Sequence, residues 1–169
     1  DRGFASLMVA EHSHIPASRE TPYPMGGDLP PEYYSTLDPF VTLAAAAAVT
    51  STIELVTGVA LLIQRDPIHC AKEAASVDLI SGGRAEIMAG RGSFIESFPL
   101  FGYSLDDYDR LFADKLALLL KLRAENPVTW QGETRAPLLK AGVFPRPVQD
   151  PLPVWIAVGG TPQSVARAG

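Results

Sequence analysis

Residues 53–89, IELVTGVALLIQRDPIHCAKEAASVDLISGGRAEIMA, contain the pattern that decides the fold. The apolar run at 53–62 is nearly continuous and rich in β-branched residues, which is typical of a strand covered on both faces. Asp66 and Pro67 then supply an N-cap and a first helical residue, and a Ser-Gly-Gly sequence ends the helix that they begin. A second apolar run follows at 85–89. The stretch therefore predicts a strand, a helix and a parallel strand in succession.

Elements of the same kind flank this stretch on both sides. Further apolar runs predict two more buried strands, at residues 6–10 and 153–158. Cap signals and apolar periodicity predict three more helices, at residues 40–50, at 108–123 and from Thr161 onward. The whole chain thus alternates between strands and helices.

This alternation predicts an α/β fold in which a parallel sheet carries helices on its outside. Two architectures of that class remain open on the pattern alone, the doubly wound open sheet and the (β/α)₈ barrel. Proline-rich excursions at residues 16–31 and 126–151 are too long for simple connections, and we interpret them as active-site loops or inserts. A length of 169 residues is enough for one core, so we expect a single domain over 1–169.

The composition excludes several classes of partner. Hydrophobic residues make up 47% of the chain and charged residues 20%, and the net charge is −5 without any cluster of Lys and Arg. We therefore expect neither nucleic acid nor a membrane surface as partner. The single cysteine, Cys70, cannot form an internal disulfide and predicts a cytoplasmic location. Because the chain starts without Met and stops where a helix is expected to begin, we expect it to be part of a longer protein.

Two glycine-rich turns follow predicted strands, at the positions where parallel α/β folds collect their functional residues. Gly90-Arg91-Gly92-Ser93 combines a backbone that can approach an anion with a guanidinium that can pair with a phosphate. Gly159-Gly160-Thr161 precedes an expected helix, whose free N–H groups also favour a phosphate. The alternative is two tight turns and a surface arginine. Because the two motifs follow equivalent strands, we interpret them together as a phosphate site.

Glu11-His12-Ser13-His14 follows the strand expected at 6–10. His and Glu are zinc ligands, but no third ligand cluster is visible, and His12 and His14 would point in opposite directions on an extended strand. We therefore expect no metal and interpret His12 as a hydrogen-bond donor to a ring or a substrate. The alternative is a buried histidine whose partners lie within the chain. Thr57-Gly58-Val59 predicts a bulge or a close ligand approach, with simple crowding in a barrel interior as the alternative.

Taken in series, these motifs resemble one known family, the luciferase-like monooxygenase superfamily. The similar segments cover essentially the whole chain and keep their order, at residues 11–12, 53–59, 66–67, 78–84 and 153–160. The resemblance implies a (β/α)₈ TIM barrel. Members of the superfamily are longer, so the chain would form a partial barrel of about four parallel strands with outer helices, the second to the fifth strand–helix units.

The resemblance also implies roles for individual residues. Gly58-Val59 matches a non-prolyl cis peptide that backs the isoalloxazine ring, and His12 matches a strand-end histidine that faces this ring. Arg91 matches an arginine that contacts the cofactor phosphate. The sequence departs from the family pattern at Ser13, where a second histidine is usual. The implied catalytic residue is His12, and the implied cofactor-binding residues are Glu11, Gly58, Val59, Gly90, Arg91, Gly92, Gly159, Gly160 and Thr161.

The implied function is that of a flavin-dependent oxidoreductase of the monooxygenase type, which acts on a small organic substrate. The cofactor would be FMN, with deazaflavin coenzyme F420 as the alternative. Residues before about 81 resemble the deazaflavin branch and residues after 84 the FMN branch, so we hypothesise a seam between two families at 81–84. A homodimer, or the missing part of the barrel, is the expected protein partner. The alternative is an engineered or natural fragment that has no activity on its own.

Overall fold

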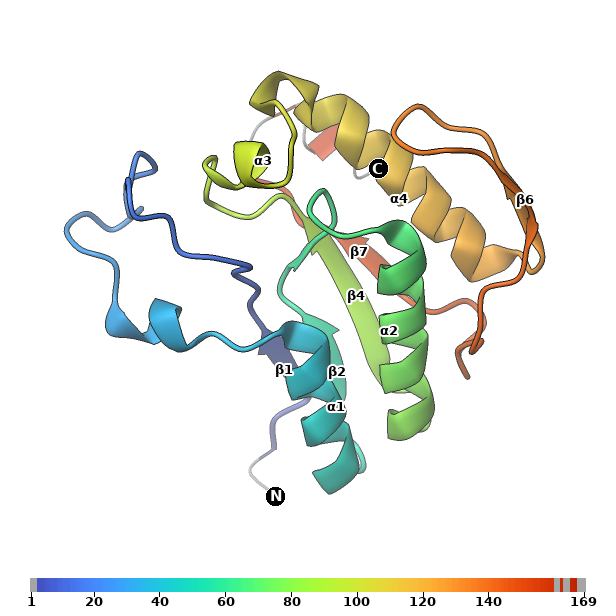
Figure 1. The fold of residues 1–169 in the computed structure, drawn as a ribbon. Coiled ribbons are helices and arrows are strands. Elements are labelled where there is room, and N and C mark those ends of the chain that lie inside the picture. Colours follow the sequence, from blue (N-terminus) through green and yellow to red (C-terminus); the bar gives the residue numbers. More distant parts are fainter. Residues whose placement is uncertain (1–2, 160–161, 163–164, 167–169) are drawn as a thin grey trace.

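A five-stranded parallel sheet forms the centre of the computed structural model, which describes residues 3–159, 162, 165 and 166. Strand β1 (Ser6–Val9) pairs with β2 (Glu54–Thr57), and β2 pairs with β4 (Ala85–Gly90). The short β3 (Ala60–Leu61) continues β2 along β4, and β7 (Val154–Ile156) pairs with β4 on its other edge. The strands therefore follow one another across the sheet in chain order (Figure 1).

This order of strands distinguishes between the two architectures that the sequence leaves open. In a doubly wound sheet the order reverses at a central strand, whereas in a (β/α)₈ barrel each new strand is added on the same side. Here β1, the β2–β3 pair, β4 and β7 are added in one direction. The sheet is thus built as part of a barrel wall, as the resemblance implies.

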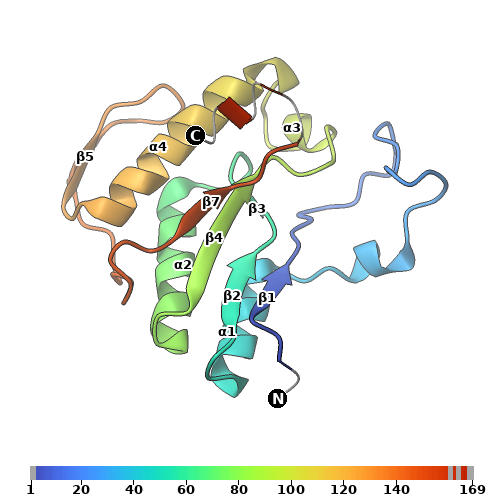
Figure 2. The same ribbon diagram turned by 180° about the vertical axis from the view of Figure 1, so that it is seen from behind.

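Three long helices, α1 (Pro39–Val49), α2 (Pro67–Ser81) and α4 (Tyr108–Ala124), cover one face of the sheet (Figures 1 and 2). Asp38 caps α1 by accepting hydrogen bonds from the next two free N–H groups, at 2.9 and 3.1 Å. Asp66 caps α2 in the same way, at 2.8 Å. Gly82 ends α2 with a φ of 69°, a left-handed conformation that favours glycine. The predicted helix signals are confirmed at both helices.

The segment at 126–151 contains an antiparallel hairpin that the sequence does not predict. Strand β5 (Val128–Trp130) pairs with β6 (Leu138–Ala141), and the hairpin packs on α4 through Leu118, Leu122 and Val128. It lies on the outer side of α4 (Figure 1), and its turn reaches the start of α2, where Arg135 pairs with Asp66 at 3.2 Å. This proline-rich excursion therefore contains an insert that packs on the outside of the helices.

The smaller elements lie in the connections at the carboxyl ends of the strands. They are η1 (Pro31–Ser35), α3 (Ser97–Leu100) and η2 (Leu105–Asp107). The helix predicted from Thr161 onward begins outside the described residues. Among the described residues, no helix combines the length and apolarity needed to cross a membrane.

The hydrophobic core lies between the sheet and its helices. Leu43 of α1, Leu55 of β2, Ile87 of β4 and Leu119 of α4 are fully buried in one cluster. The opposite face of the sheet is different, because Met8 of β1 and Trp155 of β7 are 53% and 55% exposed there. Figure 2 looks onto this face, which the helices α1, α2 and α4 leave uncovered.

Candidate functional site

His12 lies directly beyond the end of β1, between two aromatic rings. Its imidazole stacks on Tyr33 of η1, with ring centroids 4.8 Å apart, and tilts against Phe94, at 5.3 Å. Burial lowers the pKa of the His12 imidazole below its usual value. The ring is therefore neutral at neutral pH and can donate one N–H without carrying a charge.

Glu11, the neighbour of His12, uses both carboxylate oxygens within the chain. One oxygen accepts the N–H of Leu61 in β3, at 2.7 Å, and the other accepts the Nε–H of Arg65, at 2.9 Å. The side chain is buried, at 8% exposure for the residue. Glu11 thus fastens the end of β1 to β3, while its implied contact with a cofactor stays a prediction.

Arg65, which the sequence analysis did not single out, is the centre of this cluster. Its guanidinium forms ion pairs with Glu11, Asp38 and Glu73, at 2.7, 2.6 and 2.7 Å, and lies 4.8 Å from the ring centre of Phe40. Burial alone lowers the pKa of Arg65, but the hydrogen bonds and charges of these carboxylates outweigh burial and raise it. The only sequence signal was its place directly before the cap of α2.

The Gly58-Val59 segment forms the predicted bulge between β2 and β3. Leu55 pairs with Ala85 and Ala60 with Ala89, so the β2–β3 run holds one residue more than β4 over the same distance. The peptide bond between Gly58 and Val59 is cis, as the resemblance implies.

Gly90 brings this bulge against the turn that carries Arg91. A Cβ atom at Gly90 would lie 2.7 Å from Cγ2 of Val59, closer than real atoms approach. Gly92 follows with a φ of 82°, which a residue with a side chain rarely adopts. The glycines of this turn are therefore required by close packing and by backbone conformation, whether or not a ligand binds.

Arg91 and Gly159 leave the sheet at the same edge. The N–H of Ala157 donates to the carbonyl of Ala89, at 2.9 Å, so the ends of β4 and β7 lie side by side. Arg91 is exposed, and its guanidinium lies 5.2 Å from the ring centre of Tyr108. Among the described residues no carboxylate pairs with it. Gly160 and Thr161 lie outside the described residues, and their implied phosphate contacts stay predictions.

An open cleft of about 430 Å³ lies on the side of His12 toward the starts of α1 and α2. Glu11, Arg65 and Asp38 line it, together with Ser13, whose hydroxyl donates to the side-chain carbonyl of Gln64. Within the part of the chain that the structure describes, no three potential metal ligands lie together. Glu11, Arg65 and Asp38 form hydrogen bonds and ion pairs with one another along the wall of the cleft.

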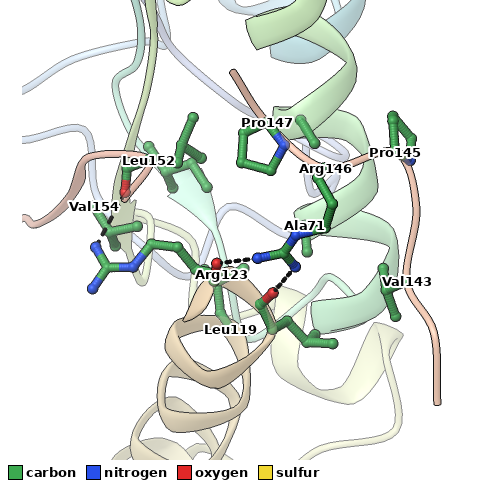
Figure 3. Close-up of a pocket in the computed structure, with 12 residues that line it drawn as sticks. Ala71, Leu119, Arg123, Val143, Pro145, Arg146, Pro147, Leu152 and Val154 are labelled. Atoms are coloured by element: carbon green, nitrogen blue, oxygen red, sulfur yellow. Dashed lines mark hydrogen bonds between the residues drawn. The ribbon is translucent and has the colours of Figure 1, made fainter. Parts of the chain in front are cut away.

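A second hollow lies far from these residues, between α2, α4 and the segment before β7 (Figure 3). Its volume of about 20 Å³ holds little more than one water molecule. Arg146 fills its rim and donates to the carbonyls of Leu122, at 2.6 Å, and Arg123 near the end of α4. Because free carbonyls gather at a helix C-terminus, we interpret this hollow as packing around a cap and no ligand site.

The fold and the strand-end site define a parallel α/β protein of the barrel type, and the comparisons agree. The family model for luciferase-like monooxygenases matches residues 1–169. The chain belongs to this family. An uncharacterized protein of Mycobacterium tuberculosis is 36% identical over 165 residues, which are 94% of this chain and 57% of that protein. The chain thus spans little more than half of that relative.

Solved structures show the same fold. The monooxygenase RslO1 of Streptomyces bottropensis has a TM-score of 0.80 and 32% identity, over 98% of this chain and 46% of its own. The oxygenating constituent of 3,6-diketocamphane monooxygenase from Pseudomonas putida, in complex with FMN, has a TM-score of 0.71 at 20% identity, over 92% of this chain and 42% of its own. An F420-dependent secondary alcohol dehydrogenase, in complex with an F420-acetone adduct, has a TM-score of 0.70 at 20% identity, over 98% of this chain and 47% of its own. The expected partial (β/α)₈ barrel is confirmed.

Proposed function

We propose that this chain supplies the cofactor-binding part of a flavin-dependent oxidoreductase of the monooxygenase type, which acts on a small organic substrate. The observation that supports the proposal best is the register of β4 and β7. It places Arg91 and Gly159 at one edge of the sheet, next to the Gly58-Val59 bulge that packs on Gly90. A phosphate group and a planar ring, linked in one cofactor, fit this arrangement.

The residues present suit such a cofactor. Arg91 has no carboxylate partner among the described residues, so its guanidinium is available for a phosphate. Val59 and Leu61 pack against Gly90 and Gly92, whereas Arg91 between them is exposed, so the guanidinium is the group of this turn that we assign to the phosphate. When bound, FMN supplies oxygen-dependent redox chemistry, and deazaflavin F420 supplies hydride transfer.

His12 would act on the ring end of the site. Because burial lowers its pKa, the imidazole remains neutral and donates a hydrogen bond without requiring a counter-ion. Tyr33 and Phe94 contact the imidazole and hold it in place, and the half-buried ring also borders the open cleft. This arrangement suits stabilisation of negative charge that develops next to the imidazole during the reaction.

FMN is the cofactor that we propose first, and F420 is the alternative. The two are distinguished by titrating the purified chain with each and following flavin fluorescence or F420 absorbance. We expect Arg91→Ala to weaken FMN binding about tenfold or more, because a charge-assisted hydrogen bond is lost. Arg110→Ala, which removes the same charge from the exposed surface of α4, is the matched control and should bind FMN like the wild type. Equal losses in both variants would contradict the role of Arg91.

A second candidate is a fragment that has no activity on its own, and the uncovered sheet face favours it. In a complete barrel, further strands would enclose the face on which Met8 and Trp155 are exposed. We propose that such strands, or a second copy of the chain, cover this face in the active protein. Light scattering gives the mass in solution. A monomer that binds neither FMN nor F420 at about millimolar concentration would favour the inert fragment over the enzyme.

A further inference from the structure

Thr57 is a polar residue at a position where the surrounding sequence is apolar. It carries the only polar side chain between residues 55 and 63, and it is fully buried at the end of β2. Threonine is mostly exposed in proteins, because a buried hydroxyl without a partner costs free energy that a valine of similar shape does not lose. The hydroxyl of Thr57 therefore needs a specific partner.

This partner is the backbone of Met88 in β4. The N–H of Met88 donates to the Thr57 hydroxyl, at 2.9 Å, and the hydroxyl donates to the carbonyl of Met88, at 3.1 Å. The preceding residue, Ile87, points to the other side of the strand, where its N–H donates to the carbonyl of Pro153, at 3.0 Å. One side chain thus satisfies both backbone groups that Met88 directs toward β2.

The bulge explains why a side chain takes the place of backbone here. Val56 pairs with Glu86 and Ala60 pairs with Ala89, so four steps along β2 and β3 lie against three steps along β4. The extra residue interrupts the ladder between these two pairs, beside Met88. Without the Thr57 hydroxyl, the N–H and the carbonyl of Met88 would both lose their partner at the interruption.

The bulge is also fastened on its other side. The N–H of Gly58 donates to the carbonyl of Val9 in β1, at 2.7 Å. The bulge is thus bonded to β1 through its backbone and to β4 through the side chain of Thr57. Since β4 runs on from Met88 into the turn that carries Arg91, this hydroxyl connects the bulge to the strand that leads to the proposed phosphate site.

We propose that Thr57 is a positioning residue of the cofactor site, whose hydroxyl fixes the Gly58-Val59 bulge against β4 so that the bulge can support the cofactor ring. This inference rests on the proposed function, because that function places the ring at the bulge. Thr57 is fully buried and acts through the bulge, without contact to the ring. Its bonds exist before a ligand binds, so the ring meets a support that binding does not have to order.

Hydrogen exchange tests the bonds of Thr57 without any cofactor. Thr57→Val keeps a similar shape and removes the hydroxyl, and we expect the protection factor of the Met88 amide to fall about tenfold or more. Thr57→Ser keeps the hydroxyl and should retain the protection. The Leu55 amide, which donates to the carbonyl of Arg84 at 2.8 Å, is the internal control and should stay protected in both variants. Unchanged protection of Met88 in Thr57→Val would overturn the inference.

Titration with FMN and with riboflavin tests the support of the ring. Riboflavin carries the same ring as FMN and no phosphate. We expect Thr57→Val to weaken both ligands by the same factor, about tenfold, whereas Arg91→Ala weakens FMN alone. A general loosening of the fold would instead weaken FMN more than riboflavin, because it disturbs the phosphate contact as well, and this result would count against a positioning role.

Two further variants complete the titration. Thr57→Ser should bind FMN and riboflavin like the wild type, because the hydroxyl is restored. Thr42→Val removes a hydroxyl that donates to the carbonyl of Asp38 in α1, at 2.9 Å, and is the matched control, which should also bind like the wild type. If circular dichroism shows that Thr57→Val unfolds, Thr57→Cys replaces it, since a thiol forms only weak hydrogen bonds.

The wild type separates this inference from the proposed function. If it binds FMN and Thr57→Val binds FMN equally well, the positioning role is wrong and the cofactor site stands. If F420 binds in place of FMN, F420 and its phosphate-free deazariboflavin portion serve as the two ligands. If neither cofactor binds, the proposed function is wrong and the support of a ring falls with it, whereas the exchange of the Met88 amide still shows whether Thr57 holds the bulge.

Discussion

The carboxylate of Glu11 and the guanidinium of Arg65 form a buried ion pair, 2.7 Å long, at the end of the strand that leads to His12. The other carboxylate oxygen of Glu11 accepts a hydrogen bond from the N–H of Leu61, at 2.7 Å. Arg65 in turn reaches Asp38, the cap of α1, at 2.6 Å. One arginine therefore connects β1, β3 and two helices at the edge of the sheet where the candidate site lies.

Removing Arg65 should destabilise the chain strongly. In Arg65→Met, Glu11 keeps a buried charge without its partner, and we expect the free energy of unfolding to fall by about 3 kcal/mol. Lys121→Met breaks an exposed pair with Glu125 and should cost less than about 0.5 kcal/mol. Urea denaturation of both variants measures the difference. Adding Glu11→Gln to Arg65→Met should restore part of the loss, and a purely additive double variant would contradict the coupling.

The bond between Thr21 and Glu96 should make the loop at 16–31 sensitive to acid. Burial works to raise the pKa of the Glu96 carboxyl, but hydrogen bonds from Thr21 outweigh it and lower this pKa to about 2. A lowered pKa in the folded state stabilises the fold above the ordinary value of 4.5, and this contribution is lost as the pH falls toward 2. The protection factor of the Thr21 amide in hydrogen exchange should therefore fall between pH 4.5 and pH 2.

Glu96→Gln should remove this acid dependence, because the amide does not titrate. The protection factor at Thr21 would then be low and constant between pH 4.5 and pH 2, whereas that of the wild type falls over this range. Glu32→Gln, at an exposed position of η1, is the control and should keep the wild-type profile. A wild-type profile in Glu96→Gln would show that another group causes the effect.

The contact between Gly90 and Val59 predicts a rescue experiment. Gly90→Ala places a methyl group 2.7 Å from a carbon of Val59, which is branched at Cβ and has few rotamers to move into. We expect the melting temperature of Gly90→Ala to fall by several degrees, which corresponds to about 1–3 kcal/mol of overpacking. Val59→Ala in the same chain removes the obstructing carbon and should raise it again. If Gly90→Ala melts like the wild type, the packing is looser than the structure shows.

Cys70 should report on unfolding. The thiol is buried in α2, and burial raises its pKa to about 12, although Arg65 works in the opposite direction. A protonated, inaccessible thiol reacts slowly with a disulfide reagent at neutral pH. We expect labelling to follow the urea transition, since Cys70 is the only cysteine in the sequence. Rapid stoichiometric labelling of the native chain would contradict its burial.

Local patterns predicted the regular elements well. Helices α1 and α2 begin at the caps Asp38 and Asp66, and α2 ends at Gly82. These signals depend on hydrogen bonds and backbone conformations within a few residues, so the local sequence is sufficient to predict them. The apolar runs also predicted where the strands form, but burial holds only for β2 and β4, because β1 and β7 leave Met8 and Trp155 exposed on one face of the sheet. The hairpin at β5 and β6 escaped prediction because its short strands are broken by turns and become ordered only against α4.

The candidate site was predicted in part. The sequence placed His12, Gly58-Val59 and Arg91 at the ends of strands, where the structure describes them, and the resemblance assigned their roles. It did not single out Arg65, whose partner Glu11 is 54 residues away along the chain. Nor did it predict the rings around His12, because Tyr33 and Phe94 come from two loops that only the folded chain brings together. The seam hypothesised at 81–84 stays a prediction.

The sequence by itself determined the alternation of strands and helices, their caps and the turns that carry the glycines, because these depend on forces between near neighbours. Only the tertiary structure decided which charges pair, which rings meet and how the register along β4 changes by one residue between β2 and β3. Ion pairs and packing depend on distances in space, and residues far apart in the chain acquire such distances only when the sheet has formed.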